Sequence, residues 1–384
     1  MERLWTKTFV IAIFGTFLLF SSFYALYPTL PLFIKSIGGS ETHIGFSMGL
    51  FMFSAVLIRP FVGVFLDRFG RKPFVVFGLL LFSFSMFTYS LVDEMSSLMV
   101  LRIVHGISWA FTTTSIATVI ADIVPSTRYG EGMGWYGTAM TLAMAFSPTL
   151  GLWIVQNLSY NSLFFIATVI SLVTFVLYVF IKTVSYPKSS SKKLVFFEKS
   201  VLLPSVSVFF LFISYASITT FVPLFANILK VNSGLFFLFY SLTLLLSRPL
   251  GGKLADKYGE KFVLIPGLLT AVLGLVTLSI SNGLFGIIIA AILYGLGFGS
   301  TSPVLQAFIL KLVSPEHRGM ANASFSTAVD LGIGFGAILF GWIAEYMGYR
   351  LLFFIGAVMV LISLITIFSL KRKVETLKNN SCLE

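Results

Sequence analysis

The sequence predicts an all-α polytopic membrane protein in which twelve transmembrane helices form two pseudo-symmetric six-helix bundles. Three observations support this fold class. The 384 residues are 57% hydrophobic and only 11% charged, whereas a soluble domain carries about 25% charged residues. The chain also divides into twelve apolar segments, each near the length of about 20 residues that crosses a bilayer. Finally, one polar stretch in the first half returns in the second half, 189 positions later.

The apolar segments follow one another along the chain, separated by breaks rich in charge, glycine or asparagine. Because lipid offers no partners to backbone groups, each segment should be helical, and the prolines in ALYPTLPLF (25–33) and TTFVPLFA (219–226) are compatible with such helices. The first apolar run, from about Phe9 to Phe33, exceeds the roughly 7–15 residues of a signal-peptide core and should be retained. The expected spans are 8–33, 43–66, 74–92, 96–122, 132–157, 162–184, 201–228, 233–255, 262–281, 284–312, 320–346 and 350–370.

A polar joint divides these spans into six and six. The stretch TVSYPKSSSKKLVFFEKS (183–200) is rich in Ser and Lys, a composition that is typical of linkers. We therefore expect an N-terminal six-helix half at 1–184, a cytoplasmic linker at 185–200, a C-terminal six-helix half at 201–370 and a cytoplasmic tail at 371–384.

The basic residues are distributed unevenly between the two sides of the expected membrane. With the N-terminus inside, 20 of the 26 Lys and Arg fall in inner segments, three lie within spans, and only Lys35, Lys230 and Arg350 fall in outer segments. This distribution follows the positive-inside rule, which places both termini in the cytoplasm. The net charge of +11 then orients a multi-pass protein of the cell membrane and favours anionic lipid. No basic soluble face is present, so we expect no nucleic-acid partner.

The sequence offers no enzyme site within the spans. The single cysteine, Cys382, lies in the polar tail, and the three histidines His43, His105 and His317 are far apart. No paired nucleophile and base appears, and the phosphate-binding motif Gly-x-x-x-x-Gly-Lys-[Ser/Thr] is missing. We therefore expect a protein that is not an enzyme, that holds no metal or other cofactor, and that is not driven by ATP through this chain.

The two halves repeat the same polar pattern. RPFVGVFLDRFGRK (59–72) aligns with RPLGGKLADKYGEK (248–261), and with the same offset Gly106 falls on Gly295. With one extra residue, PSTR (125–128) falls on PEHR (315–318). Two parallel six-span halves are typical of internally duplicated transporters.

The pattern Gly-x-x-x-Asp-Arg-x-Gly-Arg-Lys at Gly63 to Lys72, between spans two and three, resembles the signature loop of the major facilitator superfamily. The repeated loop between spans eight and nine is typical of that family too. Arg102 and Gly106 resemble its motif in span four. The resemblance covers essentially the whole chain. The resemblance implies the major facilitator fold and transport by alternating access. In the fifth span, FSPTLGLW (146–153) keeps the Pro and one Gly of the family's drug–proton antiporters but replaces two other glycines.

The resemblance also implies a cytoplasmic gate around the repeated loop. Asp67 should lie against the start of span eleven, where a helix N-terminus attracts an anion, and Arg71 should reach Asp122. Gly63 should allow close approach of another helix. In the second copy Glu260 replaces Arg71 and no acid matches Asp122, so we expect a weaker latch there; alternatively, all these charges only set topology. The candidate gate residues are Gly63, Asp67, Arg68, Gly70, Arg71, Lys72, Asp122, Gly252, Asp256 and Gly259.

Ionisable residues inside the spans mark function by default. Arg59 lies about 12 Å into its helix from Asp67, and Asp330 lies roughly 15 Å past the start of its span. Spans two and eleven are neighbours in the family that the chain resembles, so we hypothesise an ion pair between Arg59 and Asp330. Asp330 is also a candidate carrier of a coupled proton, and the alternative is a static pair that holds the halves together. Arg248 is explained only by its symmetry with Arg59.

Span four carries two further candidates. Arg102 has no equivalent in the second half, where Ala291 stands. It could bind an anionic substrate, repel a proton from a neighbouring carboxyl, or bond structurally to backbone carbonyls. His105 lies one turn further on the same face and is either a proton group or a packed neutral side chain.

Spans one, four, seven and ten line the cavity in the family that the chain resembles, and their polar and aromatic residues suit an amphipathic or drug-like ligand. Many of them could instead be packing contacts between helices. The favoured function is secondary active transport of a small organic molecule, most simply proton-coupled efflux, with a proton-coupled uptake symporter for a sugar or organic acid as the alternative. The expected partners are that substrate, the proton and the bilayer, and the chain should act as a monomer. The candidate cavity residues are Tyr24, Tyr27, Trp109, Thr113, Tyr215, Thr219, Tyr294, Ser300 and Gln306.

Overall fold

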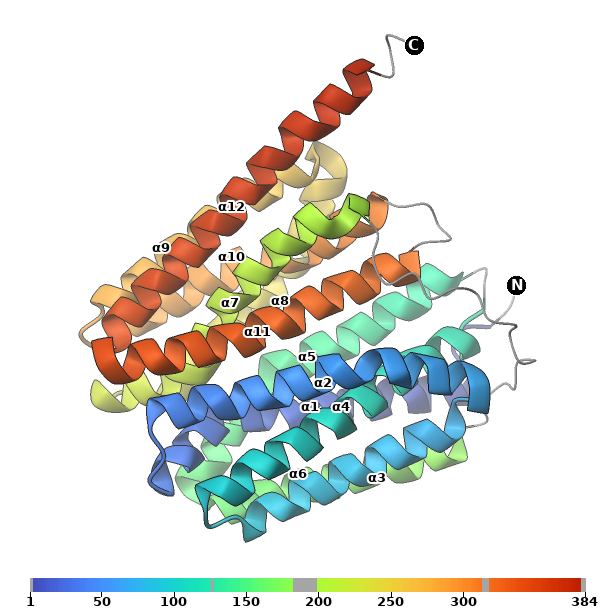
Figure 1. Cartoon of the computed structure of the whole chain (residues 1–384), viewed down its shortest axis with the longest axis vertical. Helices are drawn as coiled ribbons and strands as arrows, with labels where there is room; N and C mark the ends of the chain where they lie inside the picture. The colour runs from blue at the N-terminus through green and yellow to red at the C-terminus, as the bar shows by residue number, and fades with distance from the viewer. Residues whose placement is uncertain (1–2, 126–127, 182–198, 313–317, 381–384) are drawn as a thin grey trace. The chain divides into compact units, whose positions relative to one another are not determined.

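The computed structural model describes residues 3–125, 128–181, 199–312 and 318–380 (Figure 1). In these ranges every regular element is a helix, and twelve helices are long and apolar enough to cross a membrane. The prediction of an all-α protein with twelve spans is therefore confirmed. Most of the predicted linker lies outside the described residues, and α7 begins at Lys199.

The helices fall into two compact units, Met1–Lys193 (unit 1) and Leu194–Glu384 (unit 2). Unit 1 contains α1 (Lys7–Ser36), α2 (Glu41–Phe69), α3 (Lys72–Thr88), the short 3₁₀ helix η1 (Tyr89–Leu91), α4 (Met95–Ile123), α5 (Tyr129–Asn157) and α6 (Tyr160–Phe180). Unit 2 contains α7 (Lys199–Ile228), α8 (Ser233–Tyr258), α9 (Glu260–Ile280), α10 (Leu284–Lys311), α11 (Arg318–Met347) and α12 (Tyr349–Asn380).

The two units use the same packing scheme. In unit 1, α1 packs on α5 and α6, α4 packs on α2 and α3, and α3 packs on α6. In unit 2, α7 packs on α11 and α12, α10 packs on α8 and α9, and α9 packs on α12. Adding six to each helix number of unit 1 thus gives the main contacts of unit 2, which is the internal symmetry that the repeated loop predicted.

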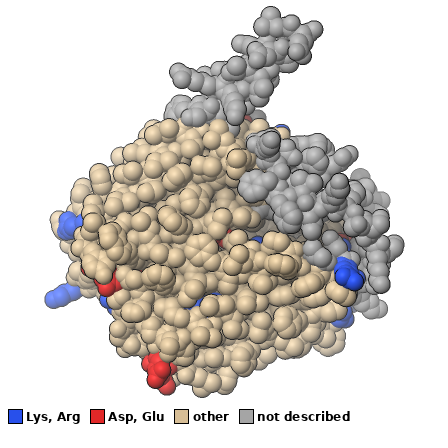
Figure 2. Space-filling view, viewed as in Figure 1, with Lys and Arg blue, Asp and Glu red and all other residues tan. Residues whose placement is uncertain are grey.

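The outward-facing sides of the helices carry large apolar side chains. Large apolar side chains such as Phe84, Phe165, Phe180 and Phe285 are exposed, as expected where lipid replaces water around a helix. In the face drawn in Figure 2, few Lys, Arg, Asp or Glu side chains interrupt the uncharged surface of the described residues. Many buried serines and threonines donate to carbonyls of their own helices, as Thr112 and Thr174 do, and these hydroxyls are satisfied without water.

A glycine ends the second helix of each half. Gly70 follows α2 with φ of 89° and ψ of 165°, and Gly259 follows α8 with φ of 88° and ψ of 156°. Only glycine adopts this region readily, and a Cβ at either position would meet nothing within 4 Å. The repeated glycines are therefore explained by backbone conformation, which turns the chain sharply from α2 into α3 and from α8 into α9.

Candidate functional site

The Gly70 turn places Arg71 between three helix ends. Its Nε donates to Oδ2 of Asp122 at 3.0 Å, and its Nη1 donates to the backbone oxygen of Leu66 at 3.0 Å. Both charged side chains are 15% exposed. Arg71 thus caps the C-terminus of α2 and ties the start of α3 to the end of α4, as the resemblance implied for this pair.

The second half carries the same pair with its charges exchanged. Glu260 and Lys311 lie 189 positions after Arg71 and Asp122, and Nζ of Lys311 donates to Oε1 of Glu260 at 2.8 Å. The side chains are 24% and 55% exposed, so solvent screens this pair more than the first. No acid matches Asp122, as the sequence shows, but the basic side chain of Lys311 stands at that position and pairs with Glu260. That this second latch is the weaker one stays a prediction.

The remaining gate candidates surround these two pairs. Arg68 is exposed in the last turn of α2, with its guanidinium carbon 5.4 Å from the centroid of the Phe69 ring, and Lys72 is exposed at the start of α3. Gly63 and Gly252 meet no atom of their own units within 4 Å of an added Cβ. Asp67 and Asp256 lie in α2 and α8, but their side chains fall outside the described part of the chain. The approach of Gly63 and of Asp67 to the other half stays a prediction.

A buried polar cluster lies deeper in unit 1, where α4 meets α2 and η1. Arg102 is 3% exposed. Its Nε donates to the backbone oxygen of Ser47 at 3.0 Å, its Nη1 donates to the Tyr89 hydroxyl at 3.0 Å, and its Nη2 donates to Sδ of Met48 at 3.3 Å. Its Cζ lies 4.3 Å from the centroid of the Phe51 ring. All these partners are neutral, and no carboxylate of the described residues pairs with this guanidinium.

His105 belongs to the same cluster as Arg102 and Tyr89. Its Nδ1 lies 2.9 Å from the Tyr89 hydroxyl and 3.3 Å from Nη1 of Arg102. Because arginine can only donate, Nδ1 accepts, and the imidazole is neutral with its proton on Nε2. That Nε2 has no hydrogen-bond partner among the described residues. The aromatic rings of Phe51, Phe82 and Tyr89 lie 4.7 to 5.6 Å from the imidazole centroid.

A small cavity of about 10 Å³ borders this cluster, which is room for about one water molecule. It is lined by Phe23, Leu26, Tyr27, Leu30, Met48, Arg102 and His105. The space beside Arg102 thus fits a water or a single small polar group, and a larger ligand would require the surrounding helices to move.

Gly106, the next residue after His105, sets how closely α4 approaches α2. A Cβ at Gly106 would lie 2.0 Å from Oγ of Ser54 and 2.2 Å from the backbone oxygen of Phe51. A Cβ at Gly295 in α10 would lie 2.0 Å from Oγ1 of Thr243 and 2.7 Å from the backbone oxygen of Tyr240. The glycine that the repeat singled out is therefore a close-packing position in both units.

The cavity candidates of unit 1 form an aromatic cluster on α1 and α4. Trp109 stacks on Phe23 with centroids 3.9 Å apart, and Tyr24 and Tyr27 both lie edge-on to Phe23 at 5.4 and 5.1 Å. Thr113 is buried and donates to the carbonyl of Trp109. The structure therefore brings these predicted residues together, although the Thr113 hydroxyl is already bonded to its own helix.

Unit 2 carries a corresponding cluster on α7 and α10. Tyr215 stacks on Phe298 with centroids 4.7 Å apart, and the Tyr294 hydroxyl lies 3.1 Å from Oγ of Ser214. Thr219 is buried and donates to the carbonyl of Tyr215. Ser300 and Gln306 are half-buried on α10. Phe298 stands at the position of Trp109 and Tyr294 at the position of His105, so both units place aromatic rings at equivalent sites.

Arg59 and Asp330 belong to different units. Arg59 is half-buried in α2, immediately before Pro60, and Asp330 is 7% exposed in α11. Each is described within its own unit, so their pairing stays a prediction. Arg248 is likewise half-buried in α8, at the position equivalent to Arg59.

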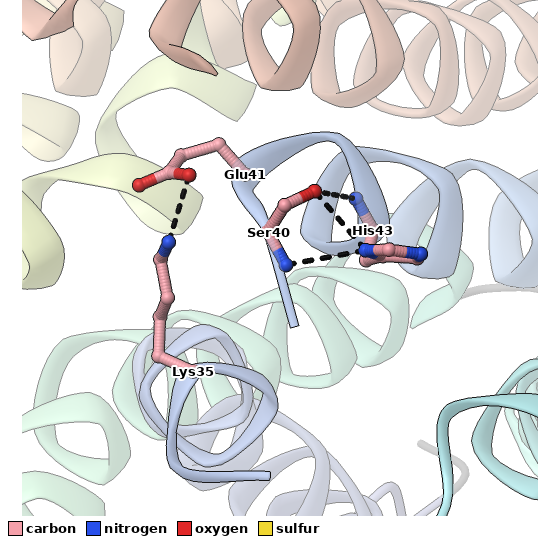
Figure 3. A network of polar contacts seen from close by, with 4 residues as sticks. All are labelled: Lys35, Ser40, Glu41 and His43. Carbon is pink, nitrogen blue, oxygen red and sulfur yellow. Dashed lines mark hydrogen bonds and ion pairs between the residues drawn. The ribbon is translucent and has the colours of Figure 1, made fainter. Parts of the chain in front are cut away.

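A separate polar group lies at the turn between α1 and α2 (Figure 3), at the opposite end of α2 from Arg71. Nζ of Lys35 lies 2.7 Å from Oε2 of Glu41. Ser40 caps α2, and its backbone N–H donates to Nδ1 of His43 at 3.2 Å. This capping box fixes the start of α2.

Sequence reasoning missed four residues of these sites. Lys311 could have been found by applying the offset to Asp122, because the equivalent position carries the opposite charge. Tyr89, Ser47 and Met48 contribute one hydroxyl, one backbone oxygen and one sulfur to Arg102, and no motif or periodicity marks such contacts. Among the described residues no group of three or more His, Cys, Asp and Glu could hold a metal ion.

The comparisons with known proteins agree with this architecture. The family model of the Major Facilitator Superfamily matches residues 12–239 and 205–381. The chain therefore belongs to the major facilitator superfamily, and it is a multi-pass membrane transporter rather than an enzyme.

Two curated relatives match most of the chain. It is 26% identical to Multidrug resistance protein 2 of Bacillus subtilis, over 92% of each chain. It is 22% identical to Quinolone resistance protein NorA of Staphylococcus aureus, over 87% of this chain and 89% of the relative. Among solved structures, an occupied bacterial homologue of the human lysosomal transporter Spinster matches with a TM-score of 0.79 at 15% identity, over 97% of this chain and 98% of that one.

Proposed function

We propose that this chain exports small organic molecules in exchange for protons, by alternating access of its two halves. The observation that carries the proposal is the pair of equivalent aromatic clusters, Phe23 with Trp109 in unit 1 and Tyr215 with Phe298 in unit 2. Stacked rings with hydroxyls nearby favour flat, amphipathic ligands over highly polar ones. Relatives that are named for multidrug and quinolone resistance support export of such compounds.

The coupling ion in this proposal is the proton, and Asp330 carries it. A buried carboxyl in the interior of a membrane span is costly unless it has a function, and Asp330 is buried in α11. Arg59 is its proposed partner across the two halves. In one state the ionised carboxyl pairs with Arg59, and in the other it is protonated and released from it.

The cytoplasmic gate is formed by the repeated loops, with both termini on the cytoplasmic side and a single chain as the working unit. The pairs Arg71–Asp122 and Glu260–Lys311 support this part of the proposal, because they join helix ends at equivalent places in the two halves. Arg71 also holds the end of α2 through the Leu66 carbonyl. Such rigid ends allow each half to move as one body.

Inside-out vesicles from cells that produce the chain test this proposal. In such vesicles an acid-inside gradient should drive accumulation of ethidium or a quinolone, and nigericin, which collapses the gradient, should abolish it. An uptake symporter would behave oppositely, because the same gradient would empty preloaded vesicles. Accumulation that is unaffected by nigericin would overturn the proton coupling. Vesicles without the chain provide the background.

A further inference from the structure

We infer that His105 is a proton-binding site of unit 1 and that Arg102 is the positioning residue that withdraws when the proton binds. This inference deepens the proposed proton coupling and rests on it. It assigns to unit 1 a second proton site, separate from the carboxyl of Asp330.

The first argument is the inventory of titratable groups. In unit 1 the carboxylates all stand at or beyond the helix ends, as Glu41, Glu94 and Asp122 do. Deep within the described spans of this unit, His105 is the one side chain whose ordinary titration range includes neutral pH. If a side chain carries a proton through the interior of unit 1, the imidazole of His105 is therefore the group best suited to do so.

The second argument is the geometry of the imidazole. The neutral ring already holds a proton on Nε2, so a further proton must bind Nδ1. The lone pair of Nδ1 is occupied by Nη1 of Arg102 and by the Tyr89 hydroxyl. Protonation would therefore place two cations in contact, and the guanidinium must move away. Proton binding and the Arg102–His105 contact exclude each other.

The proton transfer itself balances simply. A hydronium ion gives its proton to Nδ1 and becomes water, and the reverse step returns the proton to water. The cavity for about one water molecule, which Arg102, His105 and Tyr27 line, provides the place for this exchange. The Tyr89 hydroxyl can then turn its own proton away and accept from the new Nδ1–H.

The surroundings leave few other groups that can influence this step. Phe23 from α1, Phe51 from α2 and Phe82 from α3 face the ring with apolar surfaces. The ionisable groups that face it are Arg102 from α4, Tyr89 from η1 and, through the cavity, Tyr27 from α1. Arg102 is the one permanent charge among these described neighbours, so its position controls the site.

Unit 2 shows that the fold does not need this cluster. At the equivalent positions stand Ala291, Leu278 and Tyr294, yet α10 still packs on α8 with Gly295 against Tyr240. The polar cluster of unit 1 is therefore not a requirement of helix packing. Movement of Arg102 would instead change how α4 is tied to α2, through Ser47 and Met48.

Nitrogen NMR of histidine-labelled protein in lipid nanodiscs tests the site directly. The chain has three histidines, so His43→Gln with His317→Gln leaves His105 as the single labelled ring. At neutral pH we expect the Nε2–H tautomer, and acidification toward pH 5 should convert it to the imidazolium. Arg102→Met should abolish the tautomer preference. A ring that stays neutral down to pH 5 in the folded protein would overturn the inference, as would an Nδ1–H tautomer.

Transport provides the second readout. In proteoliposomes, His105→Gln should lower the number of protons moved per substrate by about twofold, whatever the rate of substrate movement, because the carboxyl of Asp330 still carries its own proton. Ser363→Ala, which removes a buried hydroxyl bond to Ser207 in unit 2, is the matched control and should keep the wild-type ratio. An unchanged ratio in His105→Gln would refute the inference. If the wild-type protein moves no protons with any substrate, the proposed function fails instead, and the NMR titration still decides whether His105 binds a proton.

Discussion

At the scale of single residues, the buried guanidinium of Arg102 has an unfavourable desolvation energy because all its partners are neutral. Removing a charge from water costs several kcal/mol, and a carboxylate partner usually offsets part of that cost. Arg102 has instead a backbone oxygen, a thioether, a hydroxyl, an imidazole and an aromatic face. Such an arrangement is held by weaker bonds than an ion pair, which makes Arg102 easier to displace than Arg71 beside Asp122.

Substituting the glycine next to this cluster tests how tightly α4 and α2 are packed. In Gly106→Ala the new methyl meets the Phe51 backbone oxygen at 2.2 Å, so the helices must separate. Overpacking of this kind costs about 1–3 kcal/mol, and we expect a clear loss of thermal stability. The measurement is the temperature at which the detergent-solubilised protein loses its monodisperse chromatographic peak.

The control for this substitution is Gly134→Ala in α5, where the methyl meets nothing within 4 Å. Alanine favours a helix over glycine by about 1 kcal/mol, so this variant should be at least as stable as the wild type. Equal stability of the two variants would show that Gly106 is not a contact position.

At the scale of helices, the exchanged charges of the two loops indicate what each pair does. Arg71–Asp122 and Glu260–Lys311 join equivalent helix ends with opposite polarity. Both halves therefore have an ion pair between the same two helix ends, but the acidic and basic residues exchange positions. This comparison favours a mechanical role for the pairs over a role in topology alone, because the positive-inside rule depends on the basic residues and needs no acid beside each of them.

Charge reversal in the first half tests this interpretation. Arg71→Glu alone places two carboxylates side by side at the end of α4, and we expect transport to fall about fivefold, which corresponds to about 1 kcal/mol, the upper end for an ion pair at a protein surface. Arg71→Glu with Asp122→Lys reproduces the arrangement of the second half and should recover most of the activity. Recovery should stay incomplete, because glutamate cannot donate to the Leu66 carbonyl. The measurement is the initial transport rate at matched protein amounts.

Two outcomes would contradict the mechanical role. One is a single Arg71→Glu variant as active as the wild type. The other is a double variant no better than the single one, which would mean that the sign at each position matters in itself.

At the scale of the whole molecule, the sequence predicted the fold, but it did not predict the side-chain contacts of the buried polar groups. Length, hydropathy and the repeat predict twelve helices in two similar units, because the bilayer permits few alternatives. The Arg71–Asp122 contact followed from family resemblance. The contacts of Tyr89 with Arg102 and His105 could not be predicted, since they depend on how the η1 turn leads from α3 into α4. The pairing of Arg59 with Asp330 joins two units and stays a prediction.

The proposed orientation of the chain has a simple test, because Cys382 is the single cysteine. A membrane-impermeant maleimide should label Cys382 in inside-out vesicles and not in intact cells. In a Cys382→Ser background, Asp93→Cys places the thiol at an exposed position between η1 and α4, which is expected to face outward. That variant should show the opposite pattern. Labelling of Cys382 in intact cells would reverse the proposed orientation.

The central claim is that movement of an organic substrate is coupled to protons through Asp330. The most direct measurement is proton flux in proteoliposomes that contain a pH dye, challenged in turn with drugs, sugars and organic acids. We predict a substrate-dependent pH change with at least one amphipathic compound, and its loss in Asp330→Asn. A pH change of full size in Asp330→Asn would contradict the role of this carboxyl. Transport of a substrate without any pH change in the wild type would contradict proton coupling altogether.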